Sequence, residues 1–148
     1  MEFRKSVASE IPTLVRISAA AFGTDADVGA PEAGGPPGYD SAEWHAAMLA
    51  DGRLYTFLGD AGAILGGAIL FSEPETLYVG RIFIESTQFR KGFGRQLMAE
   101  IEKAFPEAKT VKLDTPVWNV RTNRFYRKCG YLETARDSES VYFEKHLT

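Results

Sequence analysis

Hydrophobic residues repeat with two different periods along the chain, and each period predicts one kind of element. Over residues 11–22, Ile11, Leu14 and Phe22 recur at helical spacing, and residues 93–105 show the same pattern, so we expect helices there. Runs rich in β-branched and aromatic residues predict strands. The expected strands are residues 2–7, 54–58, 63–71, 75–84, 111–115, 131–136 and 140–146.

Capping and stop signals predict two more helices and several helix ends. Ser9 is the expected N-cap of the first helix. Pro106 is expected to end the helix of residues 93–105. Residues 40–43, Asp-Ser-Ala-Glu, have the pattern of a capping box that opens a short helix. Residues 119–129 are expected to form a helix that ends before Gly130.

Residues 23–38 separate the first two expected helices. They hold five Gly, three Pro and three acidic residues, a composition typical of a loop rather than of a helix or strand. A loop of this length in a small domain is often functional. With strands in runs and two helical crossovers late in the chain, the order of elements predicts one mixed α/β (α+β) domain with a partly antiparallel sheet over residues 1–148.

Composition narrows the class of protein. The chain has 148 residues, the size of one ordinary domain, and 45% of them are hydrophobic, which is enough for a core. No apolar stretch is long enough for a transmembrane helix, and residues 1–6 lack the apolar run of a signal peptide, so we expect a cytoplasmic protein. The single cysteine, Cys129, excludes an internal disulfide and a cysteine-rich zinc site, and no metal is expected.

Charge is distributed unevenly along the chain. The first 74 residues hold 4 Lys/Arg and 10 Asp/Glu, whereas the last 74 hold 13 and 10. The basic half favours a phosphorylated ligand. The acidic half favours a cationic acceptor such as an ammonium group, and the acids of its loop region are Asp25, Asp27, Glu32 and Asp40. The basic excess is smaller than is usual for a nucleic-acid-binding protein, so nucleic acid is not an expected partner.

A glycine-containing segment follows the expected strand 75–84 and opens the next helix. Glycines let the backbone turn sharply, and the free N–H groups of a helix's first turn bind anions. Arg90, Lys91 and Arg95 add positive charge. The P-loop pattern is absent, and Leu97 stands where a dinucleotide fingerprint needs a third glycine. A phosphate-binding cradle is therefore expected; the alternatives are a tight turn without a ligand and a nucleotide-phosphate site of another fold.

Two segments of the second half carry recognisable motifs. The loop reads Phe89-Arg90-Lys91-Gly92-Phe93-Gly94, and the helix that opens with Asn119 ends in Tyr126-Arg127-Lys128-Cys129-Gly130-Tyr131. Together they resemble the GNAT superfamily of N-acetyltransferases, which has an acyl-CoA loop Gln/Arg-x-x-Gly-x-Gly/Ala and a later helix ending in Tyr-x-Lys-x-Gly-Phe/Tyr. The resemblance covers residues 77–131, with one departure, Phe89 in place of Gln or Arg.

The resemblance implies the GNAT acyl-CoA N-acyltransferase fold, a central mixed, mostly antiparallel sheet flanked by helices. Its central strands splay apart to admit the pantetheine arm of acetyl-CoA. The pyrophosphate is expected at the loop, while Asn119 has the alternative role of a simple N-cap. The cofactor-binding residues implied are Ile82, Phe83, Ile84, Arg90, Lys91, Gly92, Phe93, Gly94, Arg95, Asn119, Asn123 and Tyr126.

Acetyl transfer to an amine needs three things: an amine without its extra proton, a donor to the developing oxyanion, and a proton for the leaving thiolate. The resemblance implies Tyr126 as the acid and the Ile84 N–H as the oxyanion donor; the alternative for Tyr126 is packing alone. Glu85, at the end of the strand nearest the thioester, is the candidate base, with a water chain as the alternative. Asp114 ends a neighbouring strand and is expected to orient a water or the amine.

The acceptor pocket is expected between the 23–40 loop and the helix that follows it. Aromatic and polar side chains there could stack on or orient the acceptor. The substrate-binding candidates are Tyr39, Trp44, His45, Tyr78 and Asp114. Trp118 and Cys129 are expected in the core.

The function expected from the resemblance is transfer of an acetyl group from acetyl-CoA to a primary amine, by direct attack in a ternary complex, with coenzyme A as product. A small amine, an amino acid, an antibiotic amine and a protein lysine all stay open as acceptors. The alternative is a non-catalytic acyl-CoA sensor or assembly module of the same fold. A membrane is not an expected partner, and homodimers are common in the family.

Overall fold

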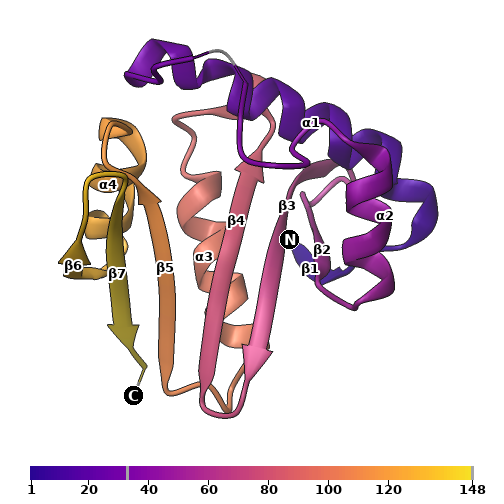
Figure 1. Cartoon of the computed structure of the whole chain (residues 1–148). Helices are drawn as coiled ribbons and strands as arrows, with labels where there is room; N and C mark the ends of the chain where they lie inside the picture. The colour runs from indigo at the N-terminus through magenta and orange to yellow at the C-terminus, as the bar shows by residue number, and fades with distance from the viewer. Residues whose placement is uncertain (33, 148) are drawn as a thin grey trace.

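Seven strands form one mixed sheet in the computed structural model of the chain, which describes residues 1–32 and 34–147 (Figure 1). Their order across the sheet is β1-β2-β3-β4-β5-β7-β6. The β4–β5 pair is parallel and the other pairs are antiparallel, which confirms the expected mixed, mostly antiparallel sheet. The strands are β1 (Glu2–Lys5), β2 (Leu54–Leu58), β3 (Ile64–Glu73), β4 (Thr76–Ile84), β5 (Thr110–Pro116), β6 (Leu132–Arg136) and β7 (Ser140–His146).

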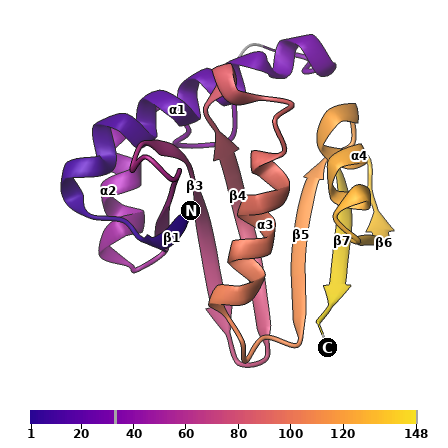
Figure 2. The same cartoon turned by 180° about the vertical axis from the view of Figure 1, so that it is seen from behind.

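Helices cover both faces of the sheet. Over the described residues the α-helices are α1 (Ile11–Gly23), α2 (Ala42–Ala50), α3 (Phe93–Ala104) and α4 (Val120–Lys128). Helices α1 and α2 lie on one face and α3 and α4 on the other, as the views from the front and from behind show (Figure 2). Each face has its own core: Ile17 packs with Phe83 on the first, and Leu97 with Val111 on the second. None of these helices has the length and apolar character that a bilayer crossing requires.

The start of the first helix differs from the expectation. Ser9 lies inside a short 3₁₀ helix, and the N-cap of α1 is Glu10. Pro12 stands in the first turn of α1, where a missing backbone N–H costs nothing. The chain therefore enters α1 through a tighter turn, and the Ser9 hydroxyl is not its cap.

The segment between α1 and α2 is more ordered than its composition predicts. Thr24–Val28 forms a 3₁₀ helix within the stretch that we expected to be a loop throughout. A short helix opens at the predicted place, but its N-cap is Ser41 rather than Asp40, the first residue of the capping-box pattern: the Ser41 hydroxyl accepts a hydrogen bond from the Trp44 N–H at 3.1 Å. The two ends of this segment are thus held by local hydrogen bonds.

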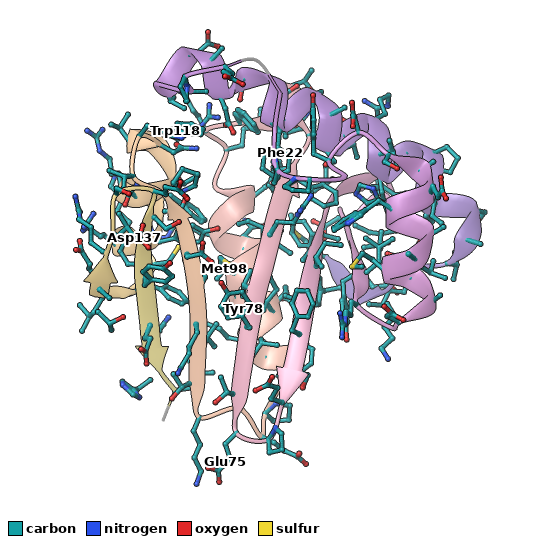
Figure 3. The ribbon with its side chains drawn as sticks, viewed as in Figure 1. Phe22, Glu75, Tyr78, Met98, Trp118 and Asp137 are labelled. Carbon is teal, nitrogen blue, oxygen red and sulfur yellow. The ribbon has the colours of Figure 1, made fainter. Side chains whose placement is uncertain are left out.

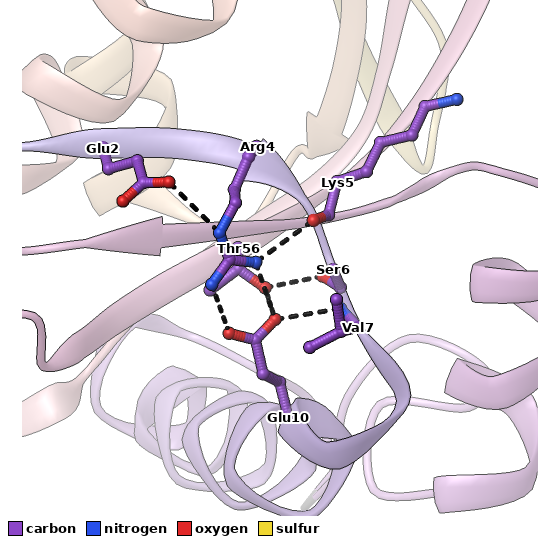
Figure 4. Close-up of polar contacts among 7 residues, drawn as sticks. All are labelled: Glu2, Arg4, Lys5, Ser6, Val7, Glu10 and Thr56. Carbon is purple, nitrogen blue, oxygen red and sulfur yellow. Dashed lines mark hydrogen bonds and ion pairs between the residues drawn. The ribbon is translucent and has the colours of Figure 1, made fainter.

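Glu10 ties the start of α1 to the edge of the sheet (Figure 4). Its carboxylate accepts hydrogen bonds from the Arg4 guanidinium at 2.7 and 3.0 Å, from the Thr56 hydroxyl at 2.9 Å and from the Val7 N–H at 3.0 Å. The Arg4 hydrogen bond is the main reason that the pKa of Glu10 falls to about 2, against the opposing effect of burial. Four donors to one carboxylate make this junction a pH-sensitive part of the fold.

We expect Glu10→Gln to lower the free energy of unfolding by about 1–2 kcal/mol at neutral pH, because it removes charge-assisted hydrogen bonds to a partly exposed arginine. The folded pKa lies below the ordinary carboxyl value of 4.5, so the stabilisation is full above that value and is lost as pH falls toward about 2. Urea unfolding at neutral pH and at pH ~3 measures this. Glu2→Gln, which removes an exposed partner of the same Arg4, is the control and should cost only a few tenths of a kcal/mol. A destabilisation that does not shrink at acid pH would contradict the prediction.

Candidate active site

The two central strands, β4 and β5, separate halfway along the sheet. Their parallel pairing ends at Val79 and Leu113, and Figure 1 shows the ribbons diverging beyond that point. Gly80 is an extra residue in β4, opposite the step from Ile69 to Leu70 in β3. Such a bulge increases the local twist and bends the strand. The bulge therefore lies where the sheet begins to open.

Beyond the bulge, β4 turns a row of backbone groups toward this opening. The Glu85 N–H donates to the carbonyl of Leu65, a residue of β3, at 2.8 Å. In an antiparallel pair, alternate residues point their N–H groups to the same side. The N–H groups of Ile82 and Ile84 therefore point away from β3, toward the side from which β5 has separated. A ligand in the opening can bond them as a neighbouring strand would.

A cavity of about 500 Å³ occupies the opening between β4 and β5. Phe22 and parts of the segment between α1 and α2 line it on one face of the sheet, and Phe125 and Tyr126 of α4 line it on the other. Phe22, at the end of α1, and Trp118, in the turn between β5 and α4, both line it and are labelled in Figure 3. The cavity thus connects the two faces through the sheet.

Tyr126 brings a phenol to the wall of this cavity. Its ring packs against Phe125, Tyr131 and Phe143, with centroids 5.2, 6.1 and 6.1 Å away, and the residue is 7% exposed. Among the described residues, none forms a hydrogen bond with its hydroxyl. Burial raises the pKa of Tyr126, so the phenol stays protonated at neutral pH and can donate a proton or a hydrogen bond.

Asp114 faces the cavity from β5, one residue beyond the last β4–β5 pair. Tyr78, on β4, donates its hydroxyl to the Asp114 Oδ1. Burial and this hydrogen bond raise the pKa of Tyr78, which therefore stays a donor. Leu113 and its alternate neighbours pack into the α3–α4 core, so strand alternation places Asp114 on the α1–α2 face. A carboxylate and a phenol, Tyr126, thus meet the cavity from opposite faces.

A second cavity-lining acid, Asp25, is held by an ion pair. Arg121 of α4 lies 3.3 Å from its carboxylate and donates to the Thr24 hydroxyl at 2.7 Å. Burial raises the pKa of Asp25 although Arg121 opposes the effect. The same guanidinium stacks over Phe89 at 5.1 Å, so the residue that departs from the motif of the loop before α3 takes part in packing. The other acids of the segment between α1 and α2, all exposed, are Asp27, Glu32 and Asp40.

The loop before α3 has the geometry of an anion site. Arg90 and Gly92 both adopt left-handed conformations, with φ of 68° and 82°, and Gly92 is the N-cap of α3. Among the described residues, no acceptor is present for the backbone N–H groups of residues 90–95. Gly94 lies against the Phe125 ring, which a Cβ would approach to 3.0 Å. Close packing therefore brings these free donors next to α4.

The structure gathers only part of the predicted site in the cavity. The Asn119 side chain accepts from the Thr122 N–H at 3.0 Å, so it is the N-cap of α4. Asn123 donates its amide to the carbonyls of Pro116 at 3.0 Å and Asn119 at 2.8 Å. The two asparagines thus hold the turn between β5 and α4. The predicted residues that line the cavity are Ile82, Asp114, Asn119 and Tyr126.

Two predicted site residues, one in β4 and one directly after it, do not line the cavity. Glu85, the candidate base, is in an ion pair with Arg16 of α1 at 3.0 Å and does not line the described cavity. Phe83 is 3% exposed and packs in the α1–α2 core. A catalytic role of Glu85 stays a prediction, and the structure gives it a structural partner.

The three candidates near α2 lie behind the cavity wall. Tyr39 packs edge-on against Phe22, with ring centroids 6.3 Å apart. Trp44 lies under the guanidinium of Arg81 at 4.3 Å. His45 is fully buried, and this burial lowers its pKa. These side chains support residues of the wall.

Sequence reasoning missed several wall residues, of which Arg81 is the most informative. It stands alone as a charge within the apolar run of residues 77–84, and such a charge inside a strand is the signal that could have identified it. Trp118, expected in the core, is partly exposed and lines the cavity instead. Cys129 packs at the margin of the α3–α4 core.

The model of the acetyltransferase (GNAT) family matches residues 21–131 of this chain. The chain belongs to the GNAT family. GNAT proteins are acyltransferases, so the cavity is a candidate active site of this class of enzyme. The chain is 32% identical over 102 residues to an N-acetyltransferase of Bacillus subtilis named YvbK, described as uncharacterized. That match covers 66% of this chain and 63% of the relative's length, less than two thirds of it.

Solved GNAT structures share the fold. The PaiA N-acetyltransferase from Thermoplasma acidophilum, solved in complex with coenzyme A, superposes with a TM-score of 0.82 at 18% identity, covering 99% of this chain and 98% of that one. A GNAT acetyltransferase from Streptococcus agalactiae gives a TM-score of 0.86 at 16% identity, covering 99% and 95%. At these identities the likeness establishes the GNAT fold of this chain.

Proposed function

We propose that this protein transfers an acetyl group from acetyl-CoA to the primary amine of an acceptor. The observation that carries the proposal is the opening between β4 and β5, where the free N–H groups of β4 face the same cavity as the Tyr126 phenol and the Asp114 carboxylate. Membership of the GNAT family supports acyl transfer, and the relative solved with coenzyme A supports acetyl-CoA as the donor.

The residues present fit the shape and charge of acetyl-CoA. The unpartnered N–H groups of residues 90–95 would bind the pyrophosphate, with Arg90, Lys91 and Arg95 adding positive charge. The N–H groups of Ile82 and Ile84 would bond the pantetheine arm in place of a strand. An open hollow on α4 offers further cations for phosphate, and these are Arg124, Arg127 and Lys128.

Acetyl-CoA supplies the acetyl group as a thioester, whose carbonyl carbon the acceptor nitrogen attacks. In the proposed mechanism Asp114 accepts the proton that the ammonium group must lose, since it lines the cavity and Glu85 is ion-paired elsewhere. The Ile84 N–H donates to the acetyl oxygen as negative charge develops there. Tyr126 donates its phenolic proton to the departing sulfur. As the amide forms, the attacking nitrogen releases its second proton to solvent, from which the Tyr126 phenolate regains one.

An acetyl-CoA turnover screen against a panel of amines, with detection of the released thiol, tests this function. Release of coenzyme A that depends on an amine, with the acetylated amine identified by mass spectrometry, is the expected result. Binding of acetyl-CoA without turnover of any amine would favour the acyl-CoA sensor or assembly module. Absence of acetyl-CoA binding would overturn both.

The anion cradle is tested by Gly92→Asp. We expect the variant to weaken acetyl-CoA binding at least about tenfold, because a carboxylate would stand among the N–H groups that bind the pyrophosphate. Gly62→Asp is the matched control: Gly62 has a similar φ of 83° against 82° for Gly92, and a Cβ at either position meets no atom within 4 Å. Titration calorimetry on both folded variants gives the comparison. Equal acetyl-CoA affinities would remove the loop from the binding site.

A further inference from the structure

We propose that the amine acceptor also carries a carboxylate, and that Arg81 binds this carboxylate in the cavity. The inference rests on the proposed function and narrows the class of acceptor from any primary amine to an amino acid or a similar amino carboxylate. The inference is carried by the Arg81 guanidinium, which lines the cavity and has one nitrogen, Nη1, without a hydrogen-bond acceptor among the described residues.

Arg81 is fixed in place by contacts that do not neutralise it. Its guanidinium lies over the Trp44 ring at 4.3 Å and near the Phe22 ring at 6.0 Å, and its Nη2 donates to the Pro37 carbonyl at 3.0 Å. Its Nη1 is shielded from solvent and has no hydrogen-bond partner among the described residues. A buried charged donor without an acceptor is costly. Because Arg81 lines the cavity, a ligand carboxylate there is favoured, and a small shift of the side chain toward it would give Nη1 an acceptor.

No carboxylate of the described chain forms an ion pair with Arg81. Three other arginines differ from it: Arg4, Arg16 and Arg121 each lie within 3.3 Å of an acidic side chain. Burial lowers the pKa of Arg81 to about 10, and no acid raises it again, yet the group is still charged at neutral pH. The cavity therefore contains a positive charge that forms no direct ion pair with a carboxylate of the described chain.

The bulge at Gly80 places this charge beside the proposed reaction centre. Regular alternation would put Tyr78 and Arg81, three residues apart, on opposite faces of β4. The extra residue puts both on the α1–α2 face, as their partners Phe71 and Ile69 in β3 indicate. The last β4–β5 pair is Val79 with Leu113. Asp114 follows it by one residue in β5, and Arg81 follows it by two residues in β4, so both lie at the start of the opening.

The pair of charges matches a zwitterion. The ammonium group would approach Asp114, and the carboxylate would reach the Arg81 guanidinium on the same face. A carboxylate fits better than a phosphate because the cavity wall also contains three acids, which would repel a dianion more strongly, and these are Asp25, Glu32 and Asp114. The geometry thus favours a singly charged anion.

Matched pairs of acceptors test the inference. The probes are glycine, β-alanine, γ-aminobutyrate and L-lysine, each compared with its own carboxamide, with spermidine and O-phosphoethanolamine as amines without a carboxylate. For at least one pair we expect kcat/KM of the acid to exceed that of the amide about tenfold to a hundredfold, the range of one charge-assisted hydrogen bond. Arg81→Met should bring the ratio close to one, Arg81→Lys should keep part of it, and acetyl-CoA affinity should not change.

Arg53→Met is the matched control, because Arg53 also lies over an aromatic ring, Phe71 at 4.5 Å, but does not line the described cavity. It should leave the acid-to-amide ratio unchanged. Turnover of amines with equal efficiency for acids and amides, or a preference for O-phosphoethanolamine, would overturn the inference and leave the proposed function standing.

The proposed acetyl transfer can also fail while the proposed carboxylate site is still tested. If acetyl-CoA binds but no amine is turned over, acetyl transfer fails, and titration calorimetry of the same acids and amides on the coenzyme A complex decides the inference. Tighter binding of an acid, lost in Arg81→Met, would support a carboxylate site; equal binding of acid and amide would overturn it. If Arg81→Met does not fold, the acid-to-amide ratio of the parent protein, compared with that of Arg81→Lys, decides whether Arg81 binds the carboxylate.

Discussion

Replacing Tyr126 with phenylalanine is expected to lower kcat about a hundredfold or more while acetyl-CoA affinity stays the same. General acid catalysis typically contributes this much, and the phenolic proton is needed only as the thiolate departs. The ring itself would remain, packed against Tyr131 and Phe143, so the variant should fold. Single-turnover kinetics with saturating acetyl-CoA and amine measure the chemical step directly.

Tyr131→Phe is the control for this result. Tyr131 belongs to the same aromatic cluster, but its hydroxyl donates to Glu102 at 3.0 Å and does not line the described cavity. Its loss should cost stability and leave kcat within about twofold. Because burial raises the pKa of Tyr126, the parent enzyme should also keep this acid up to about pH 9. An unchanged single-turnover rate in Tyr126→Phe would exclude the phenol from the mechanism.

Replacing Asp114 with asparagine is expected to lower kcat/KM by about a hundredfold to a thousandfold near neutral pH. The amide has the size of the carboxylate and can still accept from Tyr78, but it cannot take a proton from the ammonium group. The variant should recover part of its rate as pH rises, since more of the acceptor is then free amine. The measurement is kcat/KM for the amine across pH in parent and variant.

Asp137→Asn offers a matched control on the same protein. Asp137 also accepts from a tyrosine, Tyr142, at 2.9 Å, and it lies at the β6–β7 turn without lining the described cavity (Figure 3). Tyr142 is the cross-strand partner of Asp114, so this control also tests whether the neighbouring tyrosine contributes. Its replacement should leave kcat/KM within about twofold. A Glu85→Gln variant with the larger loss would instead return the base to Glu85 and assign Asp114 a positioning role.

The local elements of this fold were predictable because their causes are local. Helical spacing in residues 93–105 predicted α3, which is Phe93–Ala104, and the capping pattern of residues 40–43 predicted the start of α2 to within one residue. The loop glycines likewise predicted a sharp turn, and Gly92 adopts a left-handed conformation at the N-cap of α3. The family motifs lie in these same segments, so the family and the fold could be inferred before the strands were paired.

The arrangement of charged groups at the cavity was decided by tertiary structure. Glu85 and Arg16 are 69 residues apart in the sequence, and only the packing of α1 on the sheet brings them into an ion pair. The side on which Arg81 emerges depends on the strand register at Gly80, which belongs to the pairing of β3 with β4 and not to either strand alone. Sequence by itself determined the family and the class of enzyme and predicted a cofactor loop, because those signals lie in short segments. Which side chains line the cavity, and which charge there has no partner, depends on contacts between segments far apart in the chain, and periodicity does not encode those contacts.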